Sequence, residues 1–249
     1  KHEPIYLVAV GDIMLSRYVA QNIKENKDPS YPFAKVSWFL QNADITFGNL
    51  ENPITSGRDI KVPEMILRAD PCVVSALKDA GFNVLSLANN HLPDFGIQGV
   101  LNTIRYLDNA DIDHIGAGRY EEEAYKPRYI EVNGLKLAFL AFTDPGIAPA
   151  SYSADDNPGT AAMEPQKMAT AITKATKNAD FTVVYLHTGA EYVPEPDESQ
   201  TYFARLAIDA GADLVLGSHP HVVQNIEIYK GKYILHSLGN FIFTDIYKR

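Results

Sequence analysis

Short apolar segments alternate with helical patterns along almost the whole chain, and this alternation constrains the fold more than any other feature. The apolar segments cover residues 5–10, 44–47, 84–87, 136–142, 181–186 and 214–216. Helical patterns cover residues 32–41, 70–80, 97–109, 165–178 and 198–210, and a hairpin pattern covers 226–229 and 233–238. Strands that alternate with helices form sheets whose faces are covered by those helices. The sequence therefore predicts an α/β fold.

Length and composition narrow the class of protein. The 249 residues are 46% hydrophobic, which is enough for one large core and excludes a disordered chain. We expect a single domain over residues 1–249 that is shortened at both ends, since the chain begins at Lys1 rather than Met. The single cysteine, Cys72, excludes an internal disulfide and a cysteine zinc cage. A net charge of −9 argues against nucleic acid as a partner.

Polar residues stand directly after five of the predicted strands. They are Asp12, Asn49 with Glu51, Asn90 with His91, His187, and His219 with His221. The carboxyl ends of strands in an α/β sheet converge on ligand sites, so one shared site is favoured over isolated structural histidines. Carboxylate, amide and imidazole donors without thiolates suit one or two divalent ions, with Mn, Fe, Zn and Mg not distinguished. Such a centre polarises a phosphoryl or carbonyl oxygen and makes hydroxide at neutral pH.

Six motifs run in order through the chain. They are GDIMLSR at 11–17, NLENPIT at 49–55, NNHLPDFG at 89–96, HTGAEY at 187–192, GSHPHVVQ at 217–224 with GAD before it at 211–213, and SLGNFIF at 237–243. Together they resemble the motifs of the CapA family, the poly-γ-glutamate capsule synthesis proteins. That family is similar to the calcineurin-like metallophosphatases, so the resemblance implies a β-sandwich flanked by helices, in four α/β/β/α layers.

The resemblance also implies roles for individual residues. It makes metal ligands of Asp12, Glu51, Asn90, His187, His219 and His221. His91 would be the general acid, oriented by Asp94, and Glu191 would support the ligands or act as a general base. Met14 stands where the metallophosphatases have a histidine, which implies a single tightly held ion or two ions of unequal affinity.

Four further residues are predicted on the substrate side of the site. Arg17 and Arg68 are the cations nearest the motifs and could grip a carboxylate or phosphate, although a surface ion pair is the commoner role of such arginines. Asn49 and Asn240 are predicted to contact substrate, with Asn240 alternatively orienting the site or closing a turn.

The resemblance implies a metal-dependent hydrolase or transferase of poly-γ-glutamate or capsule polymer synthesis, whose metal-activated water attacks a phosphoryl or γ-amide centre. The alternative is a non-catalytic accessory protein that binds the polymer or a membrane synthase or exporter. In either role we expect a polyanionic polymer or its precursor as partner. We also expect a location on the extracytoplasmic face of a bacterial envelope, through a membrane anchor that this sequence lacks.

Overall fold

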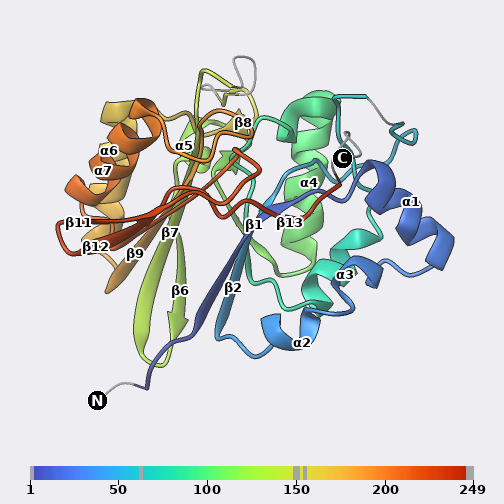
Figure 1. Cartoon of the computed structure of the whole chain (residues 1–249), viewed down its shortest axis with the longest axis horizontal. Coiled ribbons are helices and arrows are strands. Elements are labelled where there is room, and N and C mark those ends of the chain that lie inside the picture. The colour runs from blue at the N-terminus through green and yellow to red at the C-terminus, as the bar shows by residue number, and fades with distance from the viewer. Residues whose placement is uncertain (1–2, 62–63, 148–151, 154–155, 245–249) are drawn as a thin grey trace.

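Two β-sheets face each other in the computed structural model, and helices cover the outer face of each sheet (Figure 1). The structure describes residues 3–61, 64–147, 152–153 and 156–244. No helix in this described part of the chain has the length and apolar character needed to span a bilayer.

The first sheet is parallel throughout and has the strand order β13-β1-β2-β3-β4. Its strands are β1 (Leu7–Ile13), β2 (Ile45–Leu50), β3 (Val84–Ser86), β4 (Asp113–Ile115) and β13 (Asn240–Ile242). Because β13 comes from the far end of the sequence, it brings the last motif beside the first (Figure 1).

The second sheet has the order β11-β12-β10-β9-β7-β6, with a parallel centre and an antiparallel strand at each edge. Its strands are β6 (Arg128–Val132), β7 (Leu135–Thr143), β9 (Phe181–His187), β10 (Leu214–Ser218), β11 (Ile226–Tyr229) and β12 (Lys232–Leu235). A separate small ladder joins β5 (Ala117–Gly118) to β8 (Gly159–Thr160).

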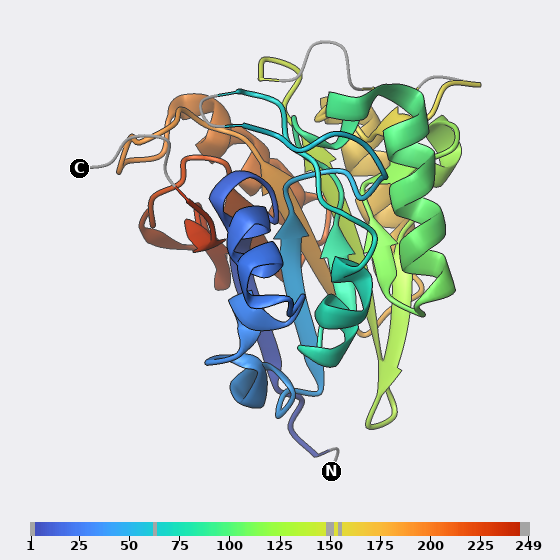
Figure 2. The same cartoon turned by 90° about the vertical axis from the view of Figure 1, so that its right-hand side faces the viewer.

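Each sheet carries its own set of helices. Figure 2 shows α1 (Arg17–Asn26), α3 (Val73–Asp79) and α4 (Gly96–Asn109) in front of the first sheet. The helices α6 (Pro165–Thr176) and α7 (Glu198–Asp209) cover the second sheet. Shorter elements are α2 (Ser37–Leu40), α5 (Glu121–Ala124), and the 3-10 turns η1 (Tyr31–Phe33) and η2 (Leu92–Phe95).

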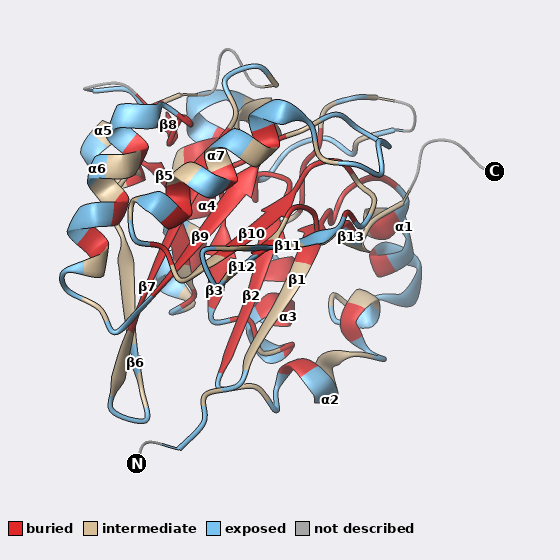
Figure 3. Cartoon of the chain, turned by 60° about the vertical axis from the view of Figure 1, so that its left-hand side comes forward, coloured by how far each residue is buried: buried red, intermediate tan, exposed pale blue. Residues whose placement is uncertain are grey.

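Three apolar layers lie between these elements. One packs the first sheet against α1, α3 and α4, and another packs the second sheet against α6 and α7. The third lies between the sheets, where the Phe47 ring is 5.4 Å from that of Tyr185 and 6.5 Å from that of Phe139, centroid to centroid. Figure 3 shows this buried interior between exposed outer helix faces. The predicted four-layer α/β/β/α arrangement is confirmed.

Local predictions were wrong at two helices. The helix predicted over 32–41 is broken into η1 and α2, with β-branched Val36 at the start of α2. The helix predicted from Asp70 begins at Val73, because the Asp70 carboxylate binds the Arg68 guanidinium at 2.7 Å instead of capping the helix. The strands β4, β6 and β13 were not predicted, because short strands depend on their neighbours for pairing.

Candidate functional site

The site is built where strands of both sheets end. Asp12 near the end of β1 lies in register with Asn49 on one side and Asn240 on the other. From the second sheet come His187, the last residue of β9, and His219, which directly follows β10. The pairing of β13 with β1 and the approach of His221 to Asp12 thus bring together residues that are more than 200 positions apart in the sequence.

A close backbone approach holds these ends in place. The Asp12 amide donates to the Gly239 carbonyl oxygen at 2.9 Å, and the Leu238 amide donates to the Gly217 carbonyl oxygen at 2.8 Å. A Cβ atom on Gly11 would lie 1.8 Å from the Gly239 oxygen, so only glycine fits at position 11. Residues 238–239 therefore tie the first sheet to the second beside Asp12.

Five of the six predicted ligands form two overlapping groups with the spacing of metal ligands, and the sixth, Asn90, lies beside them. Glu51, His187 and His219 make one group, and Asp12, Glu51 and His221 make another, with the ligand atoms of each group within 4.8 Å of one another. The Asn90 Oδ1 atom accepts from His187 Nε2 at 3.0 Å and so lies beside the first group. Glu51 belongs to both groups and could bridge two ions. We call these six residues the ligand cluster.

The buried atoms of the ligand cluster include several without a hydrogen-bond partner among the described residues. These atoms are both carboxylate oxygens of Glu51, the Oδ2 atom of Asp12 and the Nδ1 atom of His219. The Glu51 oxygen Oε1 lies 3.9 Å from Nε2 of His187 and from Nε2 of His221, too far for a hydrogen bond. Unpaired buried carboxylates are costly, and a divalent cation satisfies them. The donor set therefore fits a metal centre.

Burial controls the electrostatics of this cluster. Desolvation, with the charges of Asp12, Glu191 and Asp94, raises the pKa of Glu51 well above its ordinary range. Burial lowers the pKa of His187, and it lowers that of His219 to about 4, so both rings are neutral at pH 7. Neutral imidazoles are the form that binds metal ions.

His221 behaves differently. Burial alone favours the neutral ring, but contact with Asp12 outweighs it and raises the pKa of His221. Its Nδ1 atom lies 3.4 Å from Asp12 Oδ2 and donates to the Asn240 amide oxygen at 2.8 Å. Asn240 therefore holds the His221 ring by a hydrogen bond, and its predicted contact with substrate stays a prediction.

His91 and Asp94 form a pair beside the ligand cluster. The His91 Nδ1–H donates to Asp94 Oδ2 at 2.8 Å, and the same oxygen accepts the Leu67 amide at 2.6 Å. This arrangement fixes Asp94 and leaves Nε2 of His91 as the atom that can exchange a proton.

Asn49 lies beneath the ligands rather than beside open space. It is fully buried, donates to Asp12 Oδ1 at 2.8 Å and accepts from Asn89 Nδ2 at 3.1 Å. The structure thus gives it a positioning role in place of the predicted substrate contact.

Tyr185 and Asn89 are the residues that the sequence interpretation missed. The Tyr185 hydroxyl lies 3.0 Å from Nδ1 of His187. Asn89 accepts the amides of His91 and Leu92 and so shapes the turn that carries Asn90. For Tyr185 a signal existed, because side chains two positions apart on a strand share a face.

Of two further predicted residues, Glu191 lies in the site, whereas Arg68 belongs to the surrounding structure. Glu191 is exposed and forms a third ligand-spaced group with His219 and His221. The Arg68 guanidinium is neutralised by Asp70 and held by the carbonyl oxygens of Arg58 and Thr55, so we expect no substrate contact from it.

Met14 does not replace the missing histidine. It is fully buried in the apolar layer under α1, and its sulfur accepts the Ser16 amide at 3.2 Å. The group around Asp12 therefore has three ligand-spaced residues, whereas the group around His187 also has Asn90 within reach.

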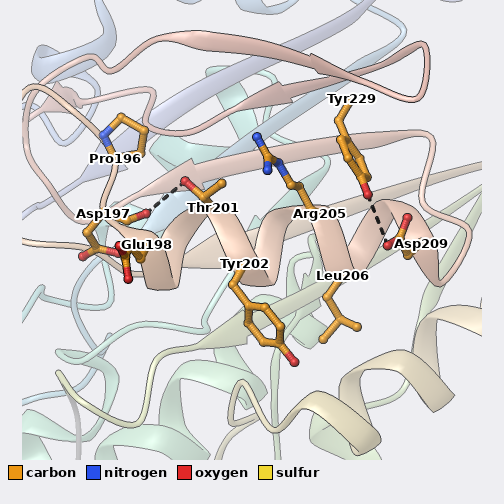
Figure 4. Close-up of a pocket in the computed structure, with 9 residues that line it drawn as sticks. All are labelled: Pro196, Asp197, Glu198, Thr201, Tyr202, Arg205, Leu206, Asp209 and Tyr229. Carbon is orange, nitrogen blue, oxygen red and sulfur yellow. Dashed lines mark hydrogen bonds between the residues drawn. The ribbon is translucent and has the colours of Figure 1, made fainter.

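A cavity of about 510 Å³ beside α7 is separate from the ligand cluster (Figure 4). Tyr229 donates to Asp209 across it at 3.4 Å, and Thr201 donates to the Asp197 backbone at 3.0 Å. None of the predicted site residues lines it.

The chain matches known proteins over nearly its whole length. The protein-family model described as "Bacterial capsule synthesis protein PGA_cap" matches residues 6–245. The "Capsule biosynthesis protein CapA" of Bacillus anthracis is 38% identical, covering 100% of this chain and 62% of that protein. The "PGA biosynthesis protein CapA" of Bacillus subtilis (strain 168) is 39% identical, covering 96% and 63%. The chain thus spans slightly under two thirds of the length of these curated relatives.

Solved structures share the fold at low sequence identity. A hypothetical protein from Thermus thermophilus has a TM-score of 0.60 at 17% identity, covering 94% of this chain and 76% of that one. A putative 5'-nucleotidase from Staphylococcus aureus also has a TM-score of 0.60, at 15% identity, covering 94% and 49%. The fold is that of the calcineurin-like metallophosphatases, as predicted. With the match over residues 6–245, the chain belongs to the bacterial capsule synthesis protein family PGA_cap.

Proposed function

We propose that this chain is a metal-dependent hydrolase or transferase that acts on a phosphoryl or γ-amide centre in capsule or poly-γ-glutamate synthesis. The observation that carries the proposal is Glu51, whose two buried, unpartnered oxygens lie between two groups of ligand-spaced side chains. A core that had evolved only for stability would not keep such a carboxylate, because its desolvation costs free energy that no protein contact returns.

In this proposal, separate groups of residues bind the metal, transfer the proton and position the other side chains. Asp12, Glu51, Asn90, His187, His219 and His221 would hold the metal, with Glu191 at the exposed side of the cluster. A divalent ion there supplies Lewis acidity and lowers the pKa of a coordinated water. His91, held by Asp94, delivers a proton to the leaving group, and Asn49 and Asn240 keep Asp12 and His221 in place.

The biological setting is proposed from the relatives. Their names speak of capsule, PGA and polyglutamine synthesis, the last for a probable accessory protein of Mycobacterium tuberculosis that is 29% identical to this chain. We expect a polyanionic polymer or its precursor as substrate, work at the bacterial envelope, and a membrane synthase or exporter as partner.

Elemental analysis of the purified protein tests the metal centre. We expect near-stoichiometric Mn, Fe or Zn after reconstitution, and a large loss in the His219→Gln variant. His236→Gln is the matched control, because His236 is equally buried but bonds to Glu227, away from the ligand cluster. If no candidate ion binds, the metalloenzyme proposal fails and an accessory binding role takes its place.

Turnover tests the reaction. Metal-loaded protein is assayed on phosphoesters and on γ-glutamyl amides, with the His91→Asn variant beside it. We expect His91→Asn to lower kcat by roughly 10²–10⁴-fold while metal content stays unchanged, because a general acid acts on the leaving group and not on the metal.

A further inference from the structure

A second cavity, of about 430 Å³, lies between α1 and the loop that leads to Arg68. Its charged lining consists of Arg17, Lys24, Lys61, Arg68 and the carboxylate Asp59. Lys24 pairs with Asp59 and Arg68 with Asp70, so Arg17 and Lys61 are the two lining cations without an ion-pair partner among the described residues. We call it the α1 cavity. The whole chain has a net charge of −9, so this local excess of cations runs against the general composition.

Arg17 is the residue that makes the α1 cavity unusual. Its side chain is held at 6% exposure, and Nη2 donates to the Glu64 carbonyl oxygen at 2.6 Å. Its Nε is buried without a hydrogen-bond partner, and no carboxylate among the described residues forms an ion pair with Arg17. Arg68, the other buried arginine, is paired with Asp70. Burying a guanidinium without a counter-charge costs free energy, and binding of an anion from solution would neutralise its charge.

The backbone around Arg17 favours an anion as well. Arg17 begins α1 with φ of +51°, a left-handed conformation that costs free energy in a residue with a side chain. The Ser16 hydroxyl does not cap α1, because it accepts the Arg68 amide at 3.1 Å. No acidic residue lies in the first turn of α1 either, so its positive end adds to the potential of the cavity.

The α1 cavity adjoins the proposed active site through two adjacent residues. The Leu67 amide donates to Asp94, the partner of His91, while the Arg68 amide donates to Ser16 at the rim of the cavity. The charges of Asp94 and Glu51 act on Arg17, and they partly offset the lowering of its pKa by burial. Arg17 therefore lies between the ligand cluster and the cavity.

We propose that the α1 cavity is a subsite for the carboxylate groups of an acidic polymer chain whose neighbouring bond reaches the ligand cluster. The proposal rests on the function proposed above, and it says where the part of the substrate that does not react would bind. The Arg17 guanidinium supplies the charge at the inner end of the cavity, while exposed Lys61, and Lys24 in exchange for its ion pair with Asp59, hold further carboxylates along the chain.

Binding of a fluorescein-labelled oligo-γ-glutamate, followed by anisotropy at low and at physiological salt, tests the subsite. The double variant Lys24→Gln/Lys61→Gln removes two exposed charges without touching the core. We expect affinity to fall roughly three- to fivefold per lysine, roughly 10–25-fold together, with a weaker dependence on salt. The control is Lys174→Gln/Lys177→Gln, an exposed pair at the C-terminal end of α6, on the other side of the molecule.

Three outcomes overturn the proposal. They are an unchanged affinity in the cavity variant, an equal loss in the α6 control, and cavity-dependent binding of inorganic polyphosphate without binding of oligo-γ-glutamate. Arg17→Gln, with folding checked by thermal unfolding, should weaken binding further than either lysine alone. The Glu51→Gln variant separates the two hypotheses. If it abolishes metal binding but keeps cavity-dependent binding of the oligomer, the subsite stands, whatever the reaction proves to be.

Discussion

Replacing Glu51 by glutamine tests the metal centre without changing the shape of the core. Both Glu51 oxygens are buried without partners, and the ligand-spaced groups around His187 and around Asp12 share this residue. The substitution removes the charge that an ion would neutralise in either group. It should therefore abolish metal binding in both at once.

The expected magnitude follows from two opposing effects. Glutamine keeps two unpartnered buried polar atoms, at about 1–3 kcal/mol each, but it removes the desolvated charge, so the metal-free variant should be at least as stable as the metal-free wild type. Bound metal stabilises the wild type by about 2.7 kcal/mol at a hundredfold excess over Kd. For a chain of 249 residues this is a rise in Tm of roughly 5–11 °C.

Thermal unfolding with and without Mn²⁺ or Zn²⁺ measures both effects. The wild type should show the rise and Glu51→Gln should not, while the metal-free Tm of the variant should equal or exceed that of the wild type. Glu131→Gln on β6 is the control, because Glu131 is exposed and should leave the metal response intact. A Glu51→Gln protein that loses several degrees without metal and still responds to metal would refute the assignment.

Further predictions concern positioning and pH. Tyr185→Phe keeps the aromatic packing on Phe47 but removes the hydroxyl 3.0 Å from Nδ1 of His187, so metal affinity measured by chelator competition should fall roughly 10–100-fold. Asn240→Ala should weaken metal retention less than His221→Ala does, because Asp12 still contacts His221 at 3.4 Å. An equal loss of metal in the two variants would contradict this. Burial lowers the pKa of His114 in the folded protein, so as the pH falls this ring is protonated in the unfolded chain before it is protonated in the folded one. The free energy of unfolding is therefore undiminished by His114 above the unfolded pKa of about 6.5, and it falls as the pH drops below that value. Urea unfolding of His114→Gln should show a flatter pH profile over that range.

The sequence by itself determined the order of strands and helices and the position of the polar residues at strand ends. These features are local, because apolar periodicity and the residues that end a strand act over a few positions. The ligand cluster could be predicted for the same reason: Asp12, Glu51, His187 and His219 each lie at or just beyond a predicted strand, and parallel strands end at a common edge.

Only the tertiary structure decided how those residues are used. It made Glu51 common to two groups, turned Asn49 into a support for Asp12, and neutralised Arg68 while leaving Arg17 without a carboxylate. Each outcome depends on partners far away in the sequence, such as Glu64 for Arg17 and Gly239 for Asp12. Burial and pairing of charges are set by packing between sheets and loops, and no local pattern encodes them.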